Sequence, residues 1–279
     1  MTRDRLSERT IVITGAGGGF GRIVAEMAAA RGANVVGADI DEDALASGFE
    51  PMTERGLSVA WKRADVTDLD DMRALATFTI ERFGRIDVMV NNAGLMPLSF
   101  FSDHEVAAAA WSKAIDVNIK GVINGIAAVH PHMIEQGRGH VINISSTYGN
   151  AGTDGSGVYS ATKSAVNVLS ESLRIESQGR IKVSVVRPTG VPSTGLAASI
   201  VNERAVVGML GHHQRAAATK MQQLFAGELP TEFADPEQIG YFSLDATHVA
   251  EAIVYVIDQP WGVSISDLTV RASGEPFLL

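Results

Sequence analysis

Short runs of apolar, mostly β-branched residues alternate along the chain with longer stretches in which apolar positions recur every three or four residues. The short runs predict strands and the longer stretches predict helices. Strands are expected at residues 10–14, 33–38, 58–64, 86–90, 140–145, 182–187 and 264–270. Helices are expected at residues 21–31, 68–83, 112–136, 158–178 and 246–259.

Continuous apolar strands that alternate with helices are typical of a parallel sheet with both faces covered. We therefore predict an α/β fold, a single doubly wound Rossmann-type domain over residues 1–279. It would contain a seven-stranded parallel sheet with helices on both faces. Residues 190–244 have helix-like pieces and no clear strand, so we expect them to form a helical substrate lid over the carboxyl edge of the sheet, where such folds bind ligands.

The composition narrows the possible partners. The chain has 279 residues and a formal net charge of −9, with no run rich in lysine or arginine, so no nucleic-acid or anionic membrane surface is expected. It has no cysteine, which fits a reducing cytoplasm. No apolar run reaches the ~20 residues of a membrane span, and the charged start MTRDRLSERT does not read as a signal peptide. We expect a cytoplasmic protein.

Five glycines fall within the eight residues TGAGGGFG, directly after the first predicted strand. The common dinucleotide pattern G-x-G-x-x-G/A does not fit here. A different spacing does fit, in which Gly15 makes the turn, Gly19 admits a pyrophosphate and Gly21 lets the helix pack on the strand. The helix N-terminus would then face the phosphates. An ordinary tight turn explains these glycines equally well.

Asp39 ends the second predicted strand, close to where an acidic residue that binds the adenosine ribose is expected. A carboxylate there accepts hydrogen bonds from both ribose hydroxyls and repels a 2′-phosphate. No lysine or arginine lies beside Asp39 or inside the glycine loop, so NAD is favoured over NADP. Without the glycines, a helix cap or turn would be the better interpretation of this aspartate.

Tyr159 and Lys163 are four residues apart in a predicted helix, so their side chains leave the same helical face. A phenol with its ordinary pKa near ~10 is a poor base at neutral pH. A nearby ammonium and an oxidised nicotinamide both favour the phenolate. The pair is common by chance, but its place after the fifth strand of a nucleotide-binding sheet favours an acid/base role.

Together these motifs resemble the short-chain dehydrogenase/reductase family, in its branch of one-domain enzymes. The resemblance covers nearly the whole chain. It rests on the glycine loop, Asp39, Asp65-Val66, the NNAG segment at residues 91–94, Asn118, Ser146 and Tyr159-x-x-x-Lys163.

The resemblance implies an NAD site and a catalytic group. Tyr159 would be the general acid/base, Lys163 would bind the nicotinamide ribose and lower the pKa of Tyr159, and Ser146 would hold the substrate oxygen. Asn118 would anchor a water that relays protons from Lys163. The implied cofactor-binding residues are Gly15, Gly19, Phe20, Gly21, Asp39, Asp65, Val66, Asn92, Ala93, Gly94, Tyr159, Lys163, Val191, Ser193 and Thr194.

Some of these roles are finer, and one segment departs from the family. Asp65 and Val66 would contact the adenine, and residues 92–94 would pass beneath the adenosine ribose. Val191 would bind the carboxamide through its backbone. Where the family usually has Pro-Gly, this chain has Pro188-Thr189-Gly190, so the choice between Ser193 and Thr194 for a hydroxyl contact stays open.

The expected substrate is a small, hydrophobic secondary alcohol or ketone. Met96 and Leu98 follow the NNAG segment, where the family lines its substrate cleft, and packing within the loop explains them equally well. Residues 190–244 offer no cluster of arginine or lysine for a phosphate or a coenzyme A tail. An NAD-binding sensor or scaffold without catalysis, and a lyase or epimerase on the same fold, are the alternatives.

Two last expectations concern metal and assembly. None of the seven histidines has the spacing of a zinc site, so no metal is expected. A helix that is apolar on two faces has more to bury than one sheet provides. The resemblance also implies pairing through the helices at 112–136 and 158–178, so we expect a homodimer or homotetramer. The first of these helices has one stripe of Ile115, Ile119, Val122, Ile126 and Val129 and a second of Ile123, Ala127 and Ile134.

Overall fold

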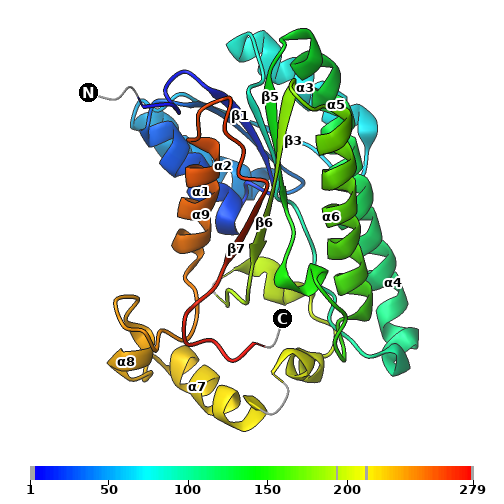
Figure 1. Ribbon diagram of the computed structural model, residues 1–279, viewed down its shortest axis with the longest axis vertical. Helices are drawn as coiled ribbons and strands as arrows, with labels where there is room; N and C mark the ends of the chain where they lie inside the picture. The colour runs from blue at the N-terminus through cyan, green and yellow to red at the C-terminus, as the bar shows by residue number, and fades with distance from the viewer. Residues whose placement is uncertain (1–3, 193, 211–212, 278–279) are drawn as a thin grey trace.

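The computed structural model describes residues 4–192, 194–210 and 213–277. In this part of the chain the strands are β1 (Thr10–Thr14), β2 (Asn34–Asp39), β3 (Val59–Arg63), β4 (Val88–Asn91), β5 (Gly139–Ile144), β6 (Ile181–Pro188) and β7 (Asp267–Val270). They form one parallel sheet in the order β3-β2-β1-β4-β5-β6-β7 (Figure 1). The predicted doubly wound sheet is confirmed, and the strand order reverses between β1 and β4.

Helices cover both faces of the sheet (Figure 1). One face packs against α1, α2 and α9, and the other packs against α3, α5 and α6. The described helices are α1 (Gly19–Ala30), α2 (Glu42–Glu54), α3 (Leu69–Phe83), α4 (His104–Ile115), α5 (Gly121–Glu135), α6 (Gly157–Glu176), α7 (Gln214–Ala226), α8 (Thr231–Ala234) and α9 (Ala246–Ile257).

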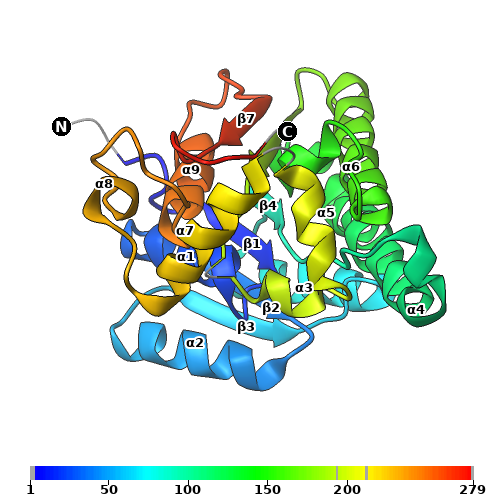
Figure 2. The same ribbon diagram turned by 90° about the horizontal axis from the view of Figure 1, so that it is seen from below.

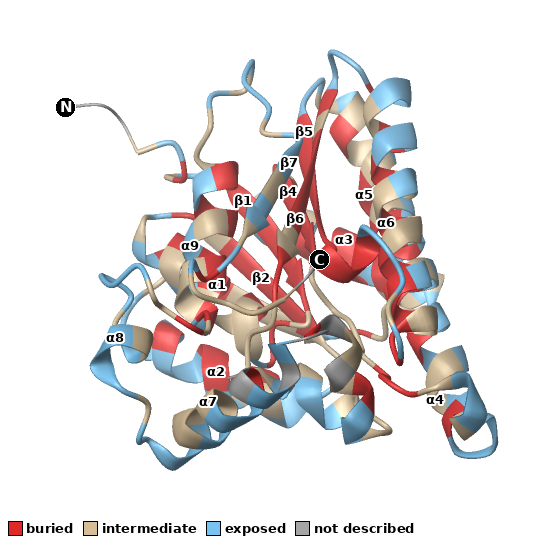
Figure 3. Ribbon diagram, turned by 60° about the horizontal axis from the view of Figure 1, so that its bottom comes forward, coloured by how far each residue is buried: buried red, intermediate tan, exposed pale blue. Residues whose placement is uncertain are grey.

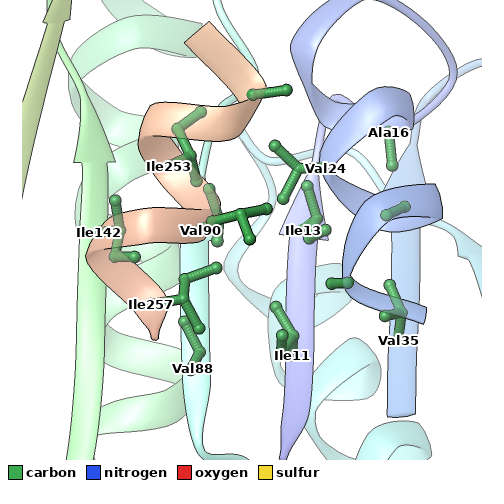
Figure 4. Close-up of a cluster of buried hydrophobic side chains, with 14 of the residues drawn as sticks. Ile11, Ile13, Ala16, Val24, Val35, Val88, Val90, Ile142, Ile253 and Ile257 are labelled. Atoms are coloured by element: carbon green, nitrogen blue, oxygen red, sulfur yellow. The ribbon is translucent and has the colours of Figure 1, made fainter. Parts of the chain in front are cut away.

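The central strands read as mostly apolar runs because successive side chains enter two different cores. Ile11 and Ile13 of β1 are buried against α1 and α9, whereas Val12 between them is buried on the side of α3 and α5. Figure 4 shows Ile11 and Ile13 beside Val88 and Val90 of β4. Each predicted strand overlaps an observed one, and for the central strands this local pattern identifies a strand buried on both faces.

The helix expected at residues 112–136 is longer and less regular than predicted. It begins with α4 and continues through a π-helical segment, η2 (Asp116–Lys120), into α5. The alanine-rich start of α4 has no apolar period to mark it. The helix α2 was not predicted because Pro51 and Gly48 interrupt its pattern, although Asp41 caps its N-terminus by accepting from the Ala44 N–H at 3.0 Å.

The segment 190–244, expected to form a helical lid, consists of helices separated by non-helical stretches in its described part. It contains the 3₁₀ segments η4 (Gly195–Ser199) and η5 (Glu203–Met209), then α7 and α8. Figure 2 shows this segment in front of the sheet when the molecule is seen from below, and Figure 3 shows the sheet buried behind it. Across the described residues, none of the helices has the length and hydropathy that crossing a bilayer requires.

Candidate active site

A cleft of about 1280 Å³ runs along the carboxyl ends of the strands, beneath the lid. It brings together most of the residues that the sequence singled out. Gly21 and Asn118 lie behind its wall, and Ser193 lies outside the described residues. The predicted site residues that line the cleft are Gly15, Gly19, Phe20, Asp39, Asp65, Val66, Asn92, Ala93, Gly94, Met96, Leu98, Ser146, Tyr159, Lys163, Val191 and Thr194.

The glycine loop is a close-packed turn between β1 and α1. Gly15 has a φ of +66°, and a Cβ there would lie 2.9 Å from the Cα of Ala93. A Cβ on Gly21 would collide with the carbonyl oxygen of Gly15. The Asn92 side chain holds this turn by donating to the carbonyl oxygens of Thr14 at 2.9 Å and Gly15 at 3.1 Å. At Gly15 and Gly21 this turn therefore has no room for a side chain.

We expect Gly21→Ala to lower the free energy of unfolding by ~1–3 kcal/mol, the usual range for overpacking, in spite of the higher helix propensity of alanine. Gly18→Ala is the matched control. Gly18 has an extended backbone and nothing within 4 Å of its Cβ position, so it should cost under ~1 kcal/mol. Urea unfolding of both variants measures the difference. Equal losses would contradict the packing role of Gly21.

The start of α1 is open toward the cleft. Its N-cap residue is Gly18. Because glycine has no side chain, it cannot cap the first backbone N–H groups of α1. Gly19 has a φ of +50°, and the nearest atom to a Cβ there would be 3.9 Å away, on Thr194. Uncapped N–H groups and the positive end of the helix dipole make this a suitable site for phosphate oxygens.

Asp39 is held against the glycine loop. Its Oδ2 accepts from the Gly17 N–H at 3.0 Å, and its Oδ1 accepts from the Asp41 N–H at 3.1 Å. The carboxylate is thereby fixed at the rim of the cleft. Two arginines lie near this corner, and neither lines the cleft: Arg22 donates to the carbonyl oxygens of Gly17 and Ala44, and Arg63, in register with Asp39 on β3, has its guanidinium 3.9 Å from Asp71.

Asp65 and Val66 form the next part of the same wall. Thr67 fixes the Asp65 carboxylate, whose Oδ1 accepts from the Thr67 N–H at 2.9 Å and from its hydroxyl at 2.8 Å. The Val66 carbonyl accepts from the Asn124 side chain at 2.8 Å, which ties the segment to α5. Both residues therefore have a defined orientation in the cleft.

Tyr159, Lys163 and Ser146 meet at the inner end of the cleft. Tyr159 and Lys163 lie on α6, and Ser146 caps the short 3₁₀ segment η3 (Thr147–Gly149) after β5. Tyr159 is 3% exposed and Lys163 is 6% exposed. Lys163 Nζ donates to the Ile144 carbonyl at 2.9 Å and lies 5.8 Å from the centre of the Tyr159 ring. The spacing of the two residues on the helix therefore gives the neighbouring pair that the sequence predicted.

Burial shifts both of these groups toward their neutral forms. It raises the pKa of Tyr159 to about 12, against the opposing effect of a hydrogen bond with the Ser146 hydroxyl. It lowers the pKa of Lys163 to about 8. In the cleft as it stands, Tyr159 is a phenol, and additional positive charge is needed to make it a phenolate near neutral pH.

Asn118 lies in the π-helical segment and is 1% exposed. Its side chain exchanges hydrogen bonds with the Leu95 backbone, both at 2.8 Å, and donates to Thr162 Oγ1 at 3.0 Å. A Cβ on Gly94 would lie 3.4 Å from Asn118 Oδ1 and 3.5 Å from Lys163 Nζ. Asn118 thus joins the loop after β4 to α6 beside Lys163, and its role in anchoring a water stays a prediction.

Thr189, where this chain departs from the Pro-Gly usual in the family, contacts a residue far along the chain. Thr189 Oγ1 donates to the Glu275 carboxylate, which also pairs with Arg271 at 2.9 Å. Phe277 packs on Gly190, where a Cβ would lie 2.7 Å from the Phe277 ring, and it lines the cleft. The C-terminal segment therefore contributes to the site.

The wall of the cleft around Leu98 is largely apolar. Leu98 is 1% exposed, and Met96 packs beside it. Tyr148 and Phe277 complete this wall and were not among the predicted residues. The position of Tyr148 two residues after Ser146 could have indicated it, whereas no local signal points to Phe277.

Two further features bear on the predictions. Thr194 Oγ1 donates to the Val191 carbonyl at 3.0 Å, so these two residues of the cleft wall are joined.

Within the part of the chain that is described, there is no group of three or more histidine, cysteine, aspartate or glutamate side chains that could hold a metal ion.

Comparisons with known proteins agree with this geometry. Residues 9–205 match the family model described as short chain dehydrogenase. The chain is 32% identical to the uncharacterized oxidoreductase Lmo0432 of Listeria monocytogenes, over 98% of this chain and 99% of that protein.

Two solved structures are similar over most of their length. A short-chain dehydrogenase/reductase from Burkholderia phymatum in complex with NAD is 30% identical, with a TM-score of 0.74, covering 96% of this chain and 90% of the other. A metagenomic short-chain oxidoreductase in complex with NADP is 26% identical, with a TM-score of 0.71, covering 98% of this chain and 100% of the other.

Proposed function

The chain belongs to the short-chain dehydrogenase/reductase family of NAD(P)-dependent oxidoreductases, and we propose that it uses NAD(H) to interconvert a hydrophobic secondary alcohol and its ketone. The observation that carries this proposal is the convergence of Tyr159, Lys163 and Ser146 at the inner end of a cleft that begins at an open helix N-terminus.

The residues of the outer cleft fit a dinucleotide. A side chain at Gly15 would fill the turn, and the uncapped start of α1 offers backbone N–H groups to a pyrophosphate. Asp39 would accept from the adenosine ribose hydroxyls and repel a 2′-phosphate, which supports NAD over NADP. Asp65 and Val66 would hold the adenine. The two similar solved structures hold NAD in one case and NADP in the other, so the preference rests on Asp39.

The inner residues supply the proton chemistry. When bound, the nicotinamide accepts the hydride in oxidation and donates it in reduction. Ser146 would hold the substrate oxygen beside the Tyr159 hydroxyl. Tyr159 would take the proton of the alcohol in oxidation and return it to the carbonyl oxygen in reduction. The Lys163 ammonium and the positive charge of a bound oxidised nicotinamide would together favour the phenolate of Tyr159.

The wall of the inner cleft supports a hydrophobic substrate. Met96, Leu98 and Phe277 line it, and an apolar pocket selects by burial with a few polar anchors. Each added buried methylene should then lower the free energy of the transition state by ~1 kcal/mol or less, and so raise kcat/KM, until the pocket is full.

The test measures oxidation of a series of alcohols with NAD⁺, from 2-propanol through cyclohexanol to bulky cyclic alcohols. The rise in NADH absorbance gives kcat/KM for each alcohol. A rising kcat/KM along the series supports the proposal. A preference for sugars or charged hydroxy acids overturns the substrate class. NADH binding without turnover of any compound favours a sensor or scaffold, and product formation without net NADH favours a lyase or epimerase.

We also propose that the protein is a homodimer or homotetramer that pairs through α5 and α6. These helices expose large apolar side chains, with Ile123 44%, Val168 66% and Ile175 59% exposed. Val122 and Val129 of α5 are buried in this chain, whereas Ile123 on another face of the same helix is not. Light scattering at micromolar concentration should give a multiple of the 29.5 kDa chain mass. A monomer mass would contradict the pairing.

We place the protein in the cytoplasm, with a small-molecule substrate and no nucleic-acid or membrane partner. The net charge of −9 disfavours binding to phosphate-rich surfaces, and a chain without cysteine suits a reducing compartment. Fractionation of cells that produce the protein tests the location.

A further inference from the structure

The inner wall of the cleft carries a polar group that the proposed proton chemistry does not use, the phenol of Tyr148. Tyr148 is 4% exposed and lines the cleft. Within the described residues, its Oη is buried and has no hydrogen-bond partner. A buried hydroxyl without a partner is destabilising, and such groups in native proteins call for an explanation. A ligand oxygen that reached this hydroxyl from the cleft would supply the missing partner.

The surrounding backbone fixes the position of this phenol. The Tyr148 N–H donates to Ser146 Oγ at 3.3 Å. The next residue, Gly149, accepts through its carbonyl oxygen from Ser164 at 2.9 Å and Asn167 at 3.1 Å, both on α6. The segment η3 is thereby held against the helix that carries Tyr159. Tyr148 and the predicted catalytic group form one rigid unit.

Tyr148 and Tyr159 are direct neighbours. Their ring centroids are 5.3 Å apart, with the ring planes at 72°. Burial raises the pKa of Tyr148, and the nearby Tyr159 raises it further, so Tyr148 stays a neutral hydroxyl. Its other neighbours, including Leu98, Ala205 and Phe277, are apolar. A ligand that reaches Tyr159 therefore also passes beside the Tyr148 ring.

Other hydroxyl groups on this side of the cleft already have partners. Ser199 Oγ accepts from the Met96 N–H at 2.7 Å and donates to the Leu196 carbonyl at 2.7 Å. Thr194 Oγ1 is engaged by the Val191 carbonyl. The donor capacity of Tyr148 Oη is thus the feature that distinguishes it from these hydroxyls.

We propose that Tyr148 is a specificity-determining residue that donates a hydrogen bond to a second oxygen of the substrate, on a carbon 1,2- or 1,3-related to the reacting one. Because the two rings are neighbours on one wall, with centroids 5.3 Å apart, one small substrate can contact both. The proposal rests on the proposed function and deepens it: the favoured substrates are diols, hydroxyketones or diketones with an apolar frame.

The test compares wild type and Tyr148→Phe with NAD⁺ on matched pairs of alcohols. Cyclohexane-1,2-diol is paired with 2-methylcyclohexanol, and cyclohexane-1,3-diol with 3-methylcyclohexanol, so that a methyl group replaces the second hydroxyl. Wild type should prefer at least one diol over its methyl partner. Tyr148→Phe should lower the ratio of kcat/KM for that diol to kcat/KM for its methyl partner by ~10-fold or more, since only the donor is removed.

A second readout does not depend on turnover. Without cofactor, Tyr148→Phe should unfold at a higher temperature than wild type, because the hydroxyl that it removes is buried without a partner. An unchanged ratio of diol to methyl compound, or a lower unfolding temperature, overturns the role of Tyr148 and leaves the proposed function standing. If wild type produces no NADH from any alcohol, the proposed function fails, and this proposal fails with it.

Discussion

Tyr159→Phe is expected to lower kcat/KM for alcohol oxidation by ~10²–10⁴-fold, the usual contribution of a positioned general acid or base. Phenylalanine keeps the ring that packs edge-on against Tyr148, with centroids 5.3 Å apart, so the wall of the cleft should stay intact. Only the hydroxyl beside Ser146 is lost. The affinity for NADH, measured by fluorescence titration, should therefore be unchanged.

The pH profile separates this role from a structural one. Burial raises the pKa of Tyr159 to about 12 in the cleft without cofactor, and the positive charge of a bound NAD⁺ would favour the phenolate. In wild type, oxidation should accelerate with rising pH as Tyr159 loses its proton. The residual activity of Tyr159→Phe should lack this dependence.

The matched control is Tyr255→Phe. Tyr255 lies on α9 with 57% of its surface exposed and does not line the cleft, so the same substitution there should leave kcat/KM and its pH profile as in wild type. Near-wild-type turnover by Tyr159→Phe would rule out the proposed mechanism.

Asp39→Ala is expected to narrow a strong preference for NAD⁺. If Asp39 sets the cofactor, wild type should favour NAD⁺ over NADP⁺ in kcat/KM by at least ~10²-fold, roughly the effect of a desolvated clash between like charges. The Gly17 and Asp41 N–H groups hold the carboxylate at the rim of the cleft, and these hydrogen bonds oppose its movement away from a 2′-phosphate. Its removal should raise activity with NADP⁺ and lower activity with NAD⁺.

Two further variants test this reading of Asp39. Asp39→Asn keeps a hydrogen-bond acceptor for the Gly17 N–H and removes the charge, so it should narrow the preference with less loss of stability. Asp43→Ala removes one exposed negative charge from the first turn of α2 and should leave the cofactor ratio unchanged. Equal use of both cofactors by wild type would show that Asp39 does not decide the choice.

Much of the fold could be predicted because its signals are local. The run Thr10–Thr14 identifies a strand buried on both faces without knowledge of its neighbours, since each side chain needs an apolar core on one side or the other. The spacing of Gly15, Gly19 and Gly21 likewise marked the turn into α1. Where local signals were weak or interrupted, as in α2 and the start of α4, the prediction missed the helix or its beginning.

Parts of the candidate site could be predicted for the same reason. Tyr159 and Lys163 share a helical face by their spacing alone, and Asp39 was identified as the end of a strand beside the glycine loop. The sequence did not predict what these side chains contact. Burial of Tyr159 and Lys163, which shifts both pKa values, depends on how α6 packs against η3 and the loop after β4.

The sequence by itself thus determined the strands, the glycine turn and the spacing of the acid/base pair, because a period of two or of about 3.6 residues is carried by near neighbours. Only the tertiary structure decided that Thr189 binds Glu275, 86 residues away, and that Phe277 reaches the cleft. It also decided that Tyr148 has a buried hydroxyl without a partner within the described residues. Such contacts join segments that no local pattern relates, since they arise when helices, lid and C-terminal segment pack onto one end of the sheet.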